Sequence, residues 1–537
     1  MRARPAPCEN GHPLHALEVK MWKAANLRRF LFIAIAGAAL AAEEIDSGVK
    51  TFTGVLAIVQ REAAEPVAVA RGIYEGAIPG MLRRLDPHSV FLDPMQFEQL
   101  KQMERSTQKG FGSVVSVLPG RVIVLQTLPG TPSARAGMSP GDEILAINDI
   151  RLELLDVEQL VELLGESRRR QVKLDVRRPG NVRILQFTLT PEELQSPSVE
   201  RVWRLRPGIG YIRVGSFDEK TGEQVREAIE KLGGAALKGL ILDLRNNAGG
   251  VVESALETAS LFLQPGSAIL SVRGRAVQHE EIKTPPDARP YTFPLAVLVN
   301  GKTASAAEIV AGAIQDHDRG AVVGEPTFGK GLVQRVMPLS EGAALALTTA
   351  FYYTPSGRSI QRPLTGLQLE RATSAQALEY KTAGGRTVKG GGGIQPDVPV
   401  APESYSRLRA VLDASGSMAT FATAFLQKNR QITPSFEVTP QVLDEFQGFL
   451  SARNILPGVG EWSVDREWIR NRLKQEIFNQ AFGVEKGDEV EAQRDPQVQR
   501  ALELLSVPAP EGGSSSPEED LALVHPVQNQ PLHQNHR

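Results

Sequence analysis

Short apolar runs and amphipathic stretches alternate through the middle of the chain. Gly239–Leu244 and Leu295–Val299 are almost wholly apolar, which is typical of buried strands. Phe217–Leu232 carries apolar side chains at helical spacing, and Ala304–Ile314 consists of small apolar residues and good helix formers. Strands that alternate with helices predict an α/β layered core, which we place at residues 199–401.

The pattern that precedes this core is different. Short β-like runs are expected at 114–118, 122–125 and 172–177, with an amphipathic helix at 157–164. Residues 107–190 are therefore predicted to form a small β-rich domain.

Helical patterns flank these two regions. Residues 44–105 carry an apolar stripe at helical spacing, and residues 402–505 are charged with helix-like periodicity. The last stretch, 507–537, is rich in Pro, Gly, Ser and polar residues, a composition that predicts disorder.

Residues 1–42 have the layout of an export leader. Basic residues precede an apolar run at 30–42 that ends in small side chains. The run is shorter than the roughly 20 residues that a membrane span needs. We expect export with cleavage, and an uncleaved anchor is the alternative. Whether Met1 or Met21 is the start stays open.

Composition excludes several classes of function. The chain has 60 basic and 62 acidic residues and no basic tract, which argues against a nucleic-acid partner. Its one cysteine, Cys8, allows no disulfide framework and no zinc site built on cysteines. No H-E-x-x-H pattern occurs among the 8 histidines, which argues against a metallopeptidase. We expect no metal and no other cofactor.

One serine stands where the strand at 295–299 turns into the next helix. Ser305 lies beside the free N–H groups of the helix start, which favour negative charge. A serine hydroxyl needs a base to take its proton. Lys330, between two glycines and ahead of an apolar pair, would become a neutral amine if it were desolvated. His317 is the alternative base, in a polar segment that is expected to be a solvated loop.

Taken singly, Ser305 would be a helix cap and Lys330 a surface charge, but in combination they resemble the C-terminal processing (tail-specific) peptidases. Three phrases carry the resemblance: T-A-S-A-A-E-I at 303–309, T-F-G-K-G-x-V-Q at 327–334 and D-L-R-x-N-x-G-G at 243–250. The separation of 25 residues between Ser305 and Lys330 also matches that family. Thr303 and Ala307 replace serines of the commonest form, and neither position carries chemistry.

The resemblance implies a role for each of these positions. Ser305 would be the nucleophile, Lys330 the general base and Gln334 the residue that orients the amine. The oxyanion hole would use the amide of Ala306 together with a glycine amide, that of Gly249 or Gly250. The core would adopt the ClpP/crotonase-like fold.

The domain at 107–190 resembles a PDZ domain, most specifically in the phrase P-G-D-x-I-x-x-I-N at 140–148. The resemblance implies that a peptide tail joins its sheet edge and that the loop Gly110–Phe111–Gly112 binds the terminal carboxylate. Arg178 is a further candidate contact, at the position of a family arginine that ties this domain to the catalytic site. A PDZ fold used only for packing is the alternative.

The resemblance implies a serine endopeptidase, and the leader pattern adds that it is exported, either periplasmic or anchored at the outer face of the cytoplasmic membrane. Its substrates would be proteins with free C-termini, and the chain would form a homodimer. Residues 44–105 would pack either on a partner chain or as a collar on their own core. The alternatives are a non-catalytic PDZ scaffold protein of the periplasm and a core with other acyl chemistry.

Overall fold

The computed structural model describes residues 45–104, 107–195, 197–367, 369–373, 379–429 and 431–506. The predicted leader at 1–42 and the predicted disordered stretch at 507–537 lie outside the described residues. The chain divides into two units after Phe91, and each is described by itself. Within the described ranges, no helix is long and apolar enough to span a bilayer.

The first unit is helical, as the apolar periodicity predicts. A helix at 45–62 is followed by the π-helical segment η1 (Arg71–Ala77) and by α2 (Ile78–Leu85). The predicted stripe on the first helix faces outward, and its exposed apolar side chains are Phe52, Val55, Ile58 and Val59. The short strand β1 (Val90–Leu92) interrupts the predicted helical region. The helix α3 (Pro94–Glu104) follows at the start of the second unit.

The predicted β-rich domain forms one antiparallel sheet in the order β3-β4-β5-β7-β8. Its strands are β3 (Ser113–Leu118), β4 (Arg121–Thr127), β5 (Glu143–Ile147), β7 (Val172–Arg177) and β8 (Leu185–Leu189), and β6 (Ile150–Arg151) pairs with β5. The helices α4 (Pro132–Arg135), η2 (Leu152–Leu154) and α5 (Val157–Ser167) complete it. A two-stranded ladder of β2 (Thr107–Gly110) and β9 (Glu192–Gln195) closes the domain just beyond the predicted boundary. In this sheet β3 is an edge strand.

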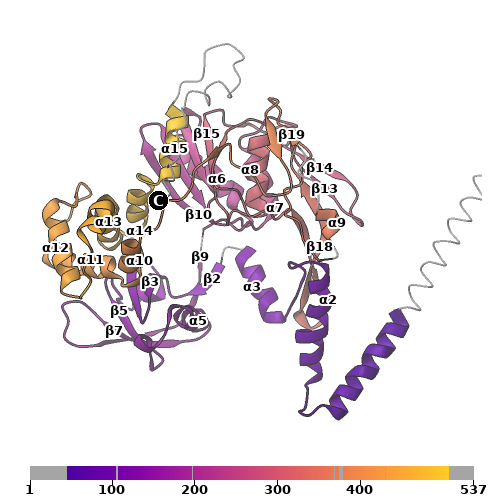
Figure 1. Ribbon diagram of the computed structural model, residues 1–537, viewed down its shortest axis with the longest axis horizontal. Coiled ribbons are helices and arrows are strands. Elements are labelled where there is room, and N and C mark those ends of the chain that lie inside the picture. Colours follow the sequence, from indigo (N-terminus) through magenta and orange to yellow (C-terminus); the bar gives the residue numbers. More distant parts are fainter. Residues whose placement is uncertain are drawn as a thin grey trace, which may run out of the picture. The chain divides into compact units, whose positions relative to one another are not determined.

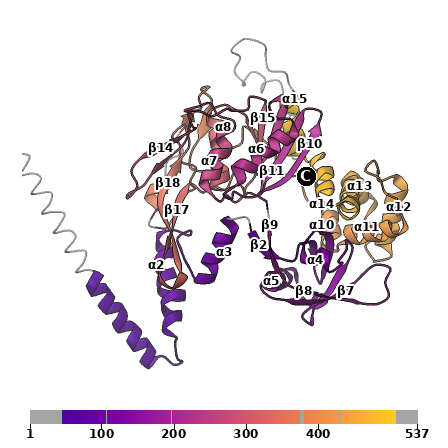
Figure 2. The same cartoon turned by 180° about the vertical axis from the view of Figure 1, so that it is seen from behind.

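The second unit also contains the predicted α/β core. Its sheet has the order β10-β11-β12-β15-β16-β21, antiparallel between β10 and β11 and parallel elsewhere. The strands are β10 (Val199–Arg206), β11 (Ile209–Val214), β12 (Gly239–Asp243), β15 (Leu295–Val299), β16 (Ala321–Gly324) and β21 (Val398–Pro399). Figures 1 and 2 show this sheet between two layers of helices.

Residues of the central strand β12 alternate between the two helical layers. Leu240 and Leu242 pack with α6 (Thr221–Leu232), α7 (Val252–Ser260) and α8 (Ala306–Asp316). Ile241 packs on the other face with α15 (Pro496–Ser506). Both faces of the strand are therefore buried, which explains its uninterrupted apolar sequence.

A second sheet lies against the α8 side of the core. It contains β13 (Ala268–Arg273), β14 (Glu280–Lys283), β17 (Leu332–Pro338) and β18 (Ala344–Tyr353), all in antiparallel pairs. Smaller elements are the hairpin β19 (Glu379–Lys381)–β20 (Thr387–Lys389), the helix α9 (Glu370–Thr373) and the 3-10 turns η3 (Gly234–Ala236) and η4 (Ser340–Gly342).

The C-terminal region is helical, as predicted, but it divides between two cores. Its first five helices are α10 (Arg407–Ala414), α11 (Ser417–Lys428), α12 (Pro440–Ser451), α13 (Val459–Phe482) and α14 (Val484–Ala492). They enclose an apolar cluster of their own that includes Phe421, Phe446 and Leu473. The last helix, α15, instead completes the layer beneath the α/β sheet.

Candidate active site

The predicted nucleophile stands at a strained turn between β15 and α8. Ser305 has φ 54° and ψ −119°, a left-handed backbone that is rare for a residue with a side chain. Hydrogen bonds on both sides hold the turn: Thr303 Oγ1 donates to Leu244 O at 2.8 Å, and Ala304 N donates to Asn247 O at 2.9 Å. The serine is thus presented, partly exposed, at the N-terminus of α8.

A buried carboxylate joins this turn to the lysine loop. Glu308 Oε2 accepts hydrogen bonds from the amides of Ser305 and Lys330, each at 2.9 Å. Glu308 Oε1 accepts from the Gly329 amide at 2.8 Å and from the Thr327 hydroxyl. The side chain is fully buried, and burial raises the pKa of Glu308 although these hydrogen bonds partly offset the effect. One side chain therefore fixes the backbone of both predicted catalytic residues.

The sequence interpretation did not single out Glu308, although a signal was available. The spacing Ser305-x-x-Glu308 is the S-x-x-E signature of a capping box, in which the acidic side chain bonds back to the N-cap amide. That signature predicts the contact with the Ser305 amide. It carries no information on the loop around Lys330, which the tertiary structure brings to the same carboxylate.

The structure brings Lys330 and Gln334 together. Lys330 Nζ donates to Gln334 Oε1 at 2.7 Å. Gln334 lies on β17 and is paired with Thr348 in the antiparallel ladder with β18. The lysine loop is held in addition by a hydrogen bond of 2.8 Å from the Gly331 amide to Gln361 Oε1.

His317, the alternative base, lies at the far end of α8 from Ser305. The 11 residues of α8 lie between them, so the two positions are about 18 Å apart along the helix axis. Its Nε2 is 2.7 Å from Ala268 O. The expected solvated loop is also wrong in part, because Asp316 is the last helical residue, is buried and pairs with Arg358 at 2.7 Å. His317 therefore does not reach the hydroxyl of Ser305.

The glycine pair after β12 lies directly against the nucleophile. A Cβ on Gly249 would lie 2.8 Å from Ser305 Cβ and 3.0 Å from Ala306 N, and a Cβ on Gly250 would lie 2.0 Å from Phe217 O. Glycine is thus required at both positions. The Gly249 amide donates to Asn247 Oδ1 at 2.8 Å. Within the described part of the chain, the amides of Ala306 and Gly250 donate to no acceptor.

Comparison with known proteins identifies the family. Residues 208–369 match the model of peptidase family S41, and residues 123–178 match that of the PDZ domain. The carboxy-terminal-processing protease of Bartonella bacilliformis is 38% identical over 298 residues, which cover 54% of this chain and 67% of that protein. The carboxyl-terminal-processing protease of Picosynechococcus is 32% identical over 62% of this chain and 80% of its own length. The chain belongs to the carboxy-terminal-processing proteases of family S41.

The solved photosystem II D1 C-terminal processing protease is 27% identical over 65% of this chain and 87% of that one, with a TM-score of 0.37. The family models and the relatives confirm the predicted family, serine-peptidase class and PDZ domain, and the sheet topology confirms the predicted α/β core. Ser305, Lys330, Gln334 and the glycine pair all lie within the range that matches family S41. The helix α15 lies outside it.

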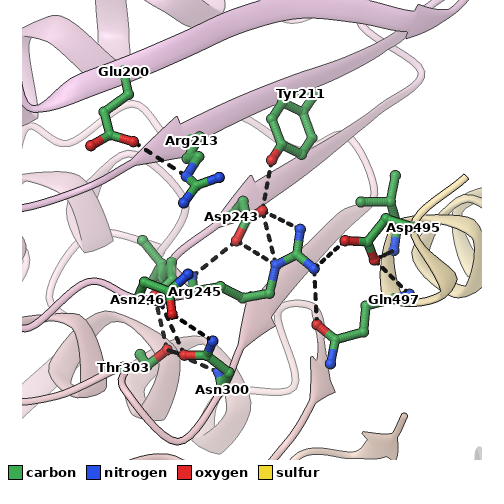
Figure 3. A network of polar contacts seen from close by, with 12 residues as sticks. Glu200, Tyr211, Arg213, Asp243, Arg245, Asn246, Asn300, Thr303, Asp495 and Gln497 are labelled. Atoms are coloured by element: carbon green, nitrogen blue, oxygen red, sulfur yellow. Dashed lines mark hydrogen bonds and ion pairs between the residues drawn. The ribbon is translucent and has the colours of Figure 1, made fainter. Parts of the chain in front are cut away.

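In this S41 protease the loop that carries the glycine pair is anchored by a charged network (Figure 3). Asp243 ends β12 fully buried and accepts hydrogen bonds from Tyr211 Oη at 2.6 Å and from Arg245 Nη2 at 2.6 Å. Burial opposes ionisation of Asp243, but the Arg245 guanidinium and the hydrogen bonds outweigh it and hold the pKa below its ordinary value. The Asn246 amide in turn donates to Asn300 Oδ1 at 3.0 Å. The glycine loop and the nucleophile turn are therefore linked to each other.

The PDZ domain of the protease places the predicted carboxylate loop at the start of β3. Gly112 has φ 78°, and a Cβ there would lie 2.2 Å from the Thr131 side chain. The Phe111 and Gly112 amides donate to no acceptor in the described chain. Arg178, by contrast, donates within its own domain, to Asp142 Oδ1 at 2.8 Å and Oδ2 at 2.7 Å.

Proposed function

We propose that this S41 protease cuts exported proteins near their C-termini, with Ser305 as nucleophile and Lys330 as general base. The observation that carries the proposal is the shared anchor of the two residues, whose amides both bind Glu308 Oε2 at 2.9 Å. The lysine amine is oriented separately by Gln334 Oε1 at 2.7 Å. Such joint fixation suits a nucleophile and a base that must meet in one geometry.

In the proposed reaction Ser305 Oγ attacks the scissile carbonyl carbon while neutral Lys330 takes the hydroxyl proton. The carbonyl oxygen becomes an oxyanion, which the free amides of Ala306 and Gly250 would receive. The C–N bond then breaks, and the lysine ammonium gives its proton to the leaving amine. A water molecule deprotonated by Lys330 releases the acyl group and restores the serine.

Gly250 suits the second oxyanion donor better than Gly249. The Gly249 amide is already bonded to Asn247 Oδ1 at 2.8 Å. Gly249 instead leaves the space beside Ser305 that a substrate carbonyl needs, because any side chain there would press on Ser305 Cβ.

We assign tail recognition to the PDZ domain. The free edge of β3 would accept the substrate tail as an added strand, and the Phe111 and Gly112 amides would bind its terminal carboxylate. Val157 and Val161 are exposed on α5, the helix that faces β3, and would contact apolar side chains of the tail. Arg178 would stabilise this domain through Asp142 rather than bind the peptide directly.

Export and self-association belong to the same proposal. The leader pattern at 1–42 supports a periplasmic enzyme, free or held at the outer face of the cytoplasmic membrane. The outward apolar stripe of the helix at 45–62 supports association with a second copy, since exposed apolar surface of this kind marks interaction sites.

Peptide cleavage by the full chain tests the proposal. The substrate is an unstructured polypeptide with an apolar C-terminus, offered with a free and with an amidated terminal carboxyl group. The variants Ser305→Ala and Lys330→Ala should lose cleavage while they stay folded. The matched changes Ser340→Ala and Lys283→Ala, at exposed positions, should retain it.

Each outcome is decisive. Cleavage that survives in Lys330→Ala removes the lysine from the mechanism. Equal cleavage of the free and amidated substrates argues against carboxylate capture. If the parent binds the free tail but does not cut, the non-catalytic binding protein becomes the better account.

A further inference from the structure

The last helix of the chain reaches the active-site edge of the catalytic sheet. α15 buries Val498, Ala501, Leu502 and Leu505 against the face of the sheet opposite α8. Its N-terminal end lies beside the carboxyl ends of β12 and β15, as Figure 3 shows for Asp495 and Gln497 next to Arg245. This edge is where the chain leaves β12 for the glycine pair and β15 for Ser305.

Asp495 has two bonding tasks at this end of the helix. Its Oδ1 accepts hydrogen bonds from the amides of Gln497 at 2.8 Å and Val498 at 3.1 Å, which makes it the N-terminal cap of α15. Its Oδ2 accepts from Arg245 Nη1 at 2.5 Å. Gln497 adds a second acceptor for the same nitrogen at 3.1 Å and is itself held at Val400 O.

Arg245 therefore lies between a carboxylate of the sheet and a carboxylate of the C-terminal helix. Its Nε and Nη2 atoms point to Asp243, and its Nη1 atom points to Asp495. The side chain is only 15% exposed, so these partners replace its hydration. With both ends of the guanidinium held, the Arg245 side chain restrains the backbone at the start of the loop.

The constraint on this backbone extends to the proposed oxyanion hole. Asn246 follows Arg245 in a left-handed conformation, φ 60°, and exchanges two hydrogen bonds of 3.0 Å with Asn300 in the nucleophile turn. Asn247 then accepts from Ala304 N and from Gly249 N. Only two residues, Ala248 and Gly249, separate the anchored Asn247 from Gly250.

We propose that Asp495 is a positioning residue of the protease, which sets the oxyanion loop 244–250 through Arg245. The inference rests on the proposed function of that loop. It makes α15 part of the catalytic unit although the helix lies more than a hundred residues beyond the range that matches family S41. Asp495 touches no reacting atom; its contribution is to keep the Gly250 amide where the oxyanion forms.

The test compares Asp495→Asn with the parent in the full chain. Asparagine keeps an oxygen for the cap of α15 but removes the charge that holds Arg245. We expect kcat for peptide cleavage to fall about 10- to 100-fold, since small misplacements in an active site have effects of this size. KM should change little, and the melting temperature should fall by only a few degrees, because Gln497 Oε1 still accepts from Arg245 Nη1. Glu503→Gln, the matched change on the exposed side of the same helix, should behave as the parent.

Hydrogen exchange measured by mass spectrometry supplies a readout that is independent of activity. Peptides that cover 244–251 should exchange faster in Asp495→Asn, whereas peptides that cover α8 and α15 should not. Asp495→Glu, which retains the charge, should recover part of the kcat.

Three results would overturn the proposal. In the first, Asp495→Asn matches the parent in both kcat and loop exchange. In the second, exchange rises throughout α15 and the sheet and kcat falls only with the folded fraction, which shows a purely structural role. In the third, the loop loosens but kcat is unchanged. If the parent itself does not cleave, the proposed function fails, and the exchange measurement still decides whether Asp495 holds the loop.

Discussion

Glu308→Gln is the most informative single substitution, because one carboxylate accepts four hydrogen bonds from the nucleophile turn and the lysine loop. Glutamine has nearly the same shape but only one acceptor oxygen. If that oxygen takes the place of Oε2, it keeps the amides of Ser305 and Lys330. The new NH2 group then faces the Thr327 hydroxyl, which can turn to accept, and the Gly329 amide, which cannot.

The magnitude follows from that count. One buried N–H group, that of Gly329, loses its acceptor, and an unsatisfied buried donor costs about 1–3 kcal/mol of unfolding free energy. For a folding unit of 150–250 residues this corresponds to a decrease in melting temperature of about 2–4 °C for each kcal/mol. Because the lost bond holds the residue next to Lys330, we expect kcat to fall by about 10- to 100-fold with KM nearly unchanged.

The assay combines thermal unfolding with steady-state cleavage well below the melting temperature. Glu325→Gln is the matched control, since Glu325 lies at the start of the same loop with a partly exposed side chain. Glu308→Ala would strip all four donors and could prevent folding, so it is the less useful variant. The reasoning is refuted if Glu308→Gln unfolds within about 0.5 kcal/mol of the parent and keeps its kcat, because four satisfied donors predict otherwise.

Three further predictions concern the same unit. Gly249→Ala would place a Cβ 2.8 Å from Ser305 Cβ, so labelling of Ser305 by a serine-reactive phosphonate should slow about 100-fold or more; labelling at the parent rate would show that the loop can move away. Leu502→Ala, at a buried position of α15, should reduce the free energy of unfolding by about 2–5 kcal/mol in urea titrations, and a loss below about 1 kcal/mol would contradict the packing of α15 on the sheet. Burial raises the pKa of Glu308 in the folded protein above that of the unfolded chain. The folded state therefore loses stability as the pH rises from the ordinary glutamate pKa through the raised pKa. The stability advantage of the parent over Glu308→Gln should therefore narrow as the pH of urea titrations is raised from that of ordinary glutamate, about pH 4. An advantage that widens with pH would contradict the raised pKa.

Local patterns in the sequence were sufficient for much of the fold and for placing the predicted site residues within it. Apolar runs bounded by turn residues predicted β12 and β15, and small helix formers after Asn300–Thr303 predicted α8. Ser305 could be placed at the start of α8 because strand, turn and helix follow one another directly. Lys330 and Gln334 are four residues apart, and their contact is likewise a local one.

The alternatives that the sequence left open depended on distances through space. His317 is closer to Ser305 in sequence than Lys330 is, but a rigid helix holds it at the opposite end of α8. The glycine pair offered two equivalent amides, and only the contact of Gly249 with Asn247 distinguishes them. Helical periodicity predicted α15 but could not indicate whether it packs with the other C-terminal helices or on the sheet, because an apolar stripe fits either surface.

The sequence by itself thus determined most of the elements and the family, and it supplied the residues that we propose as nucleophile and base. Each of these depends on residue types and spacings along short stretches of the chain. The tertiary structure alone decided what holds those residues in place. Glu308 links two loops that are about twenty positions apart, and Asp495 meets Arg245 across 250 positions. Hydrogen bonds and ion pairs act over a few ångströms in space, so long-range partners become visible only when the folded chain has brought them together.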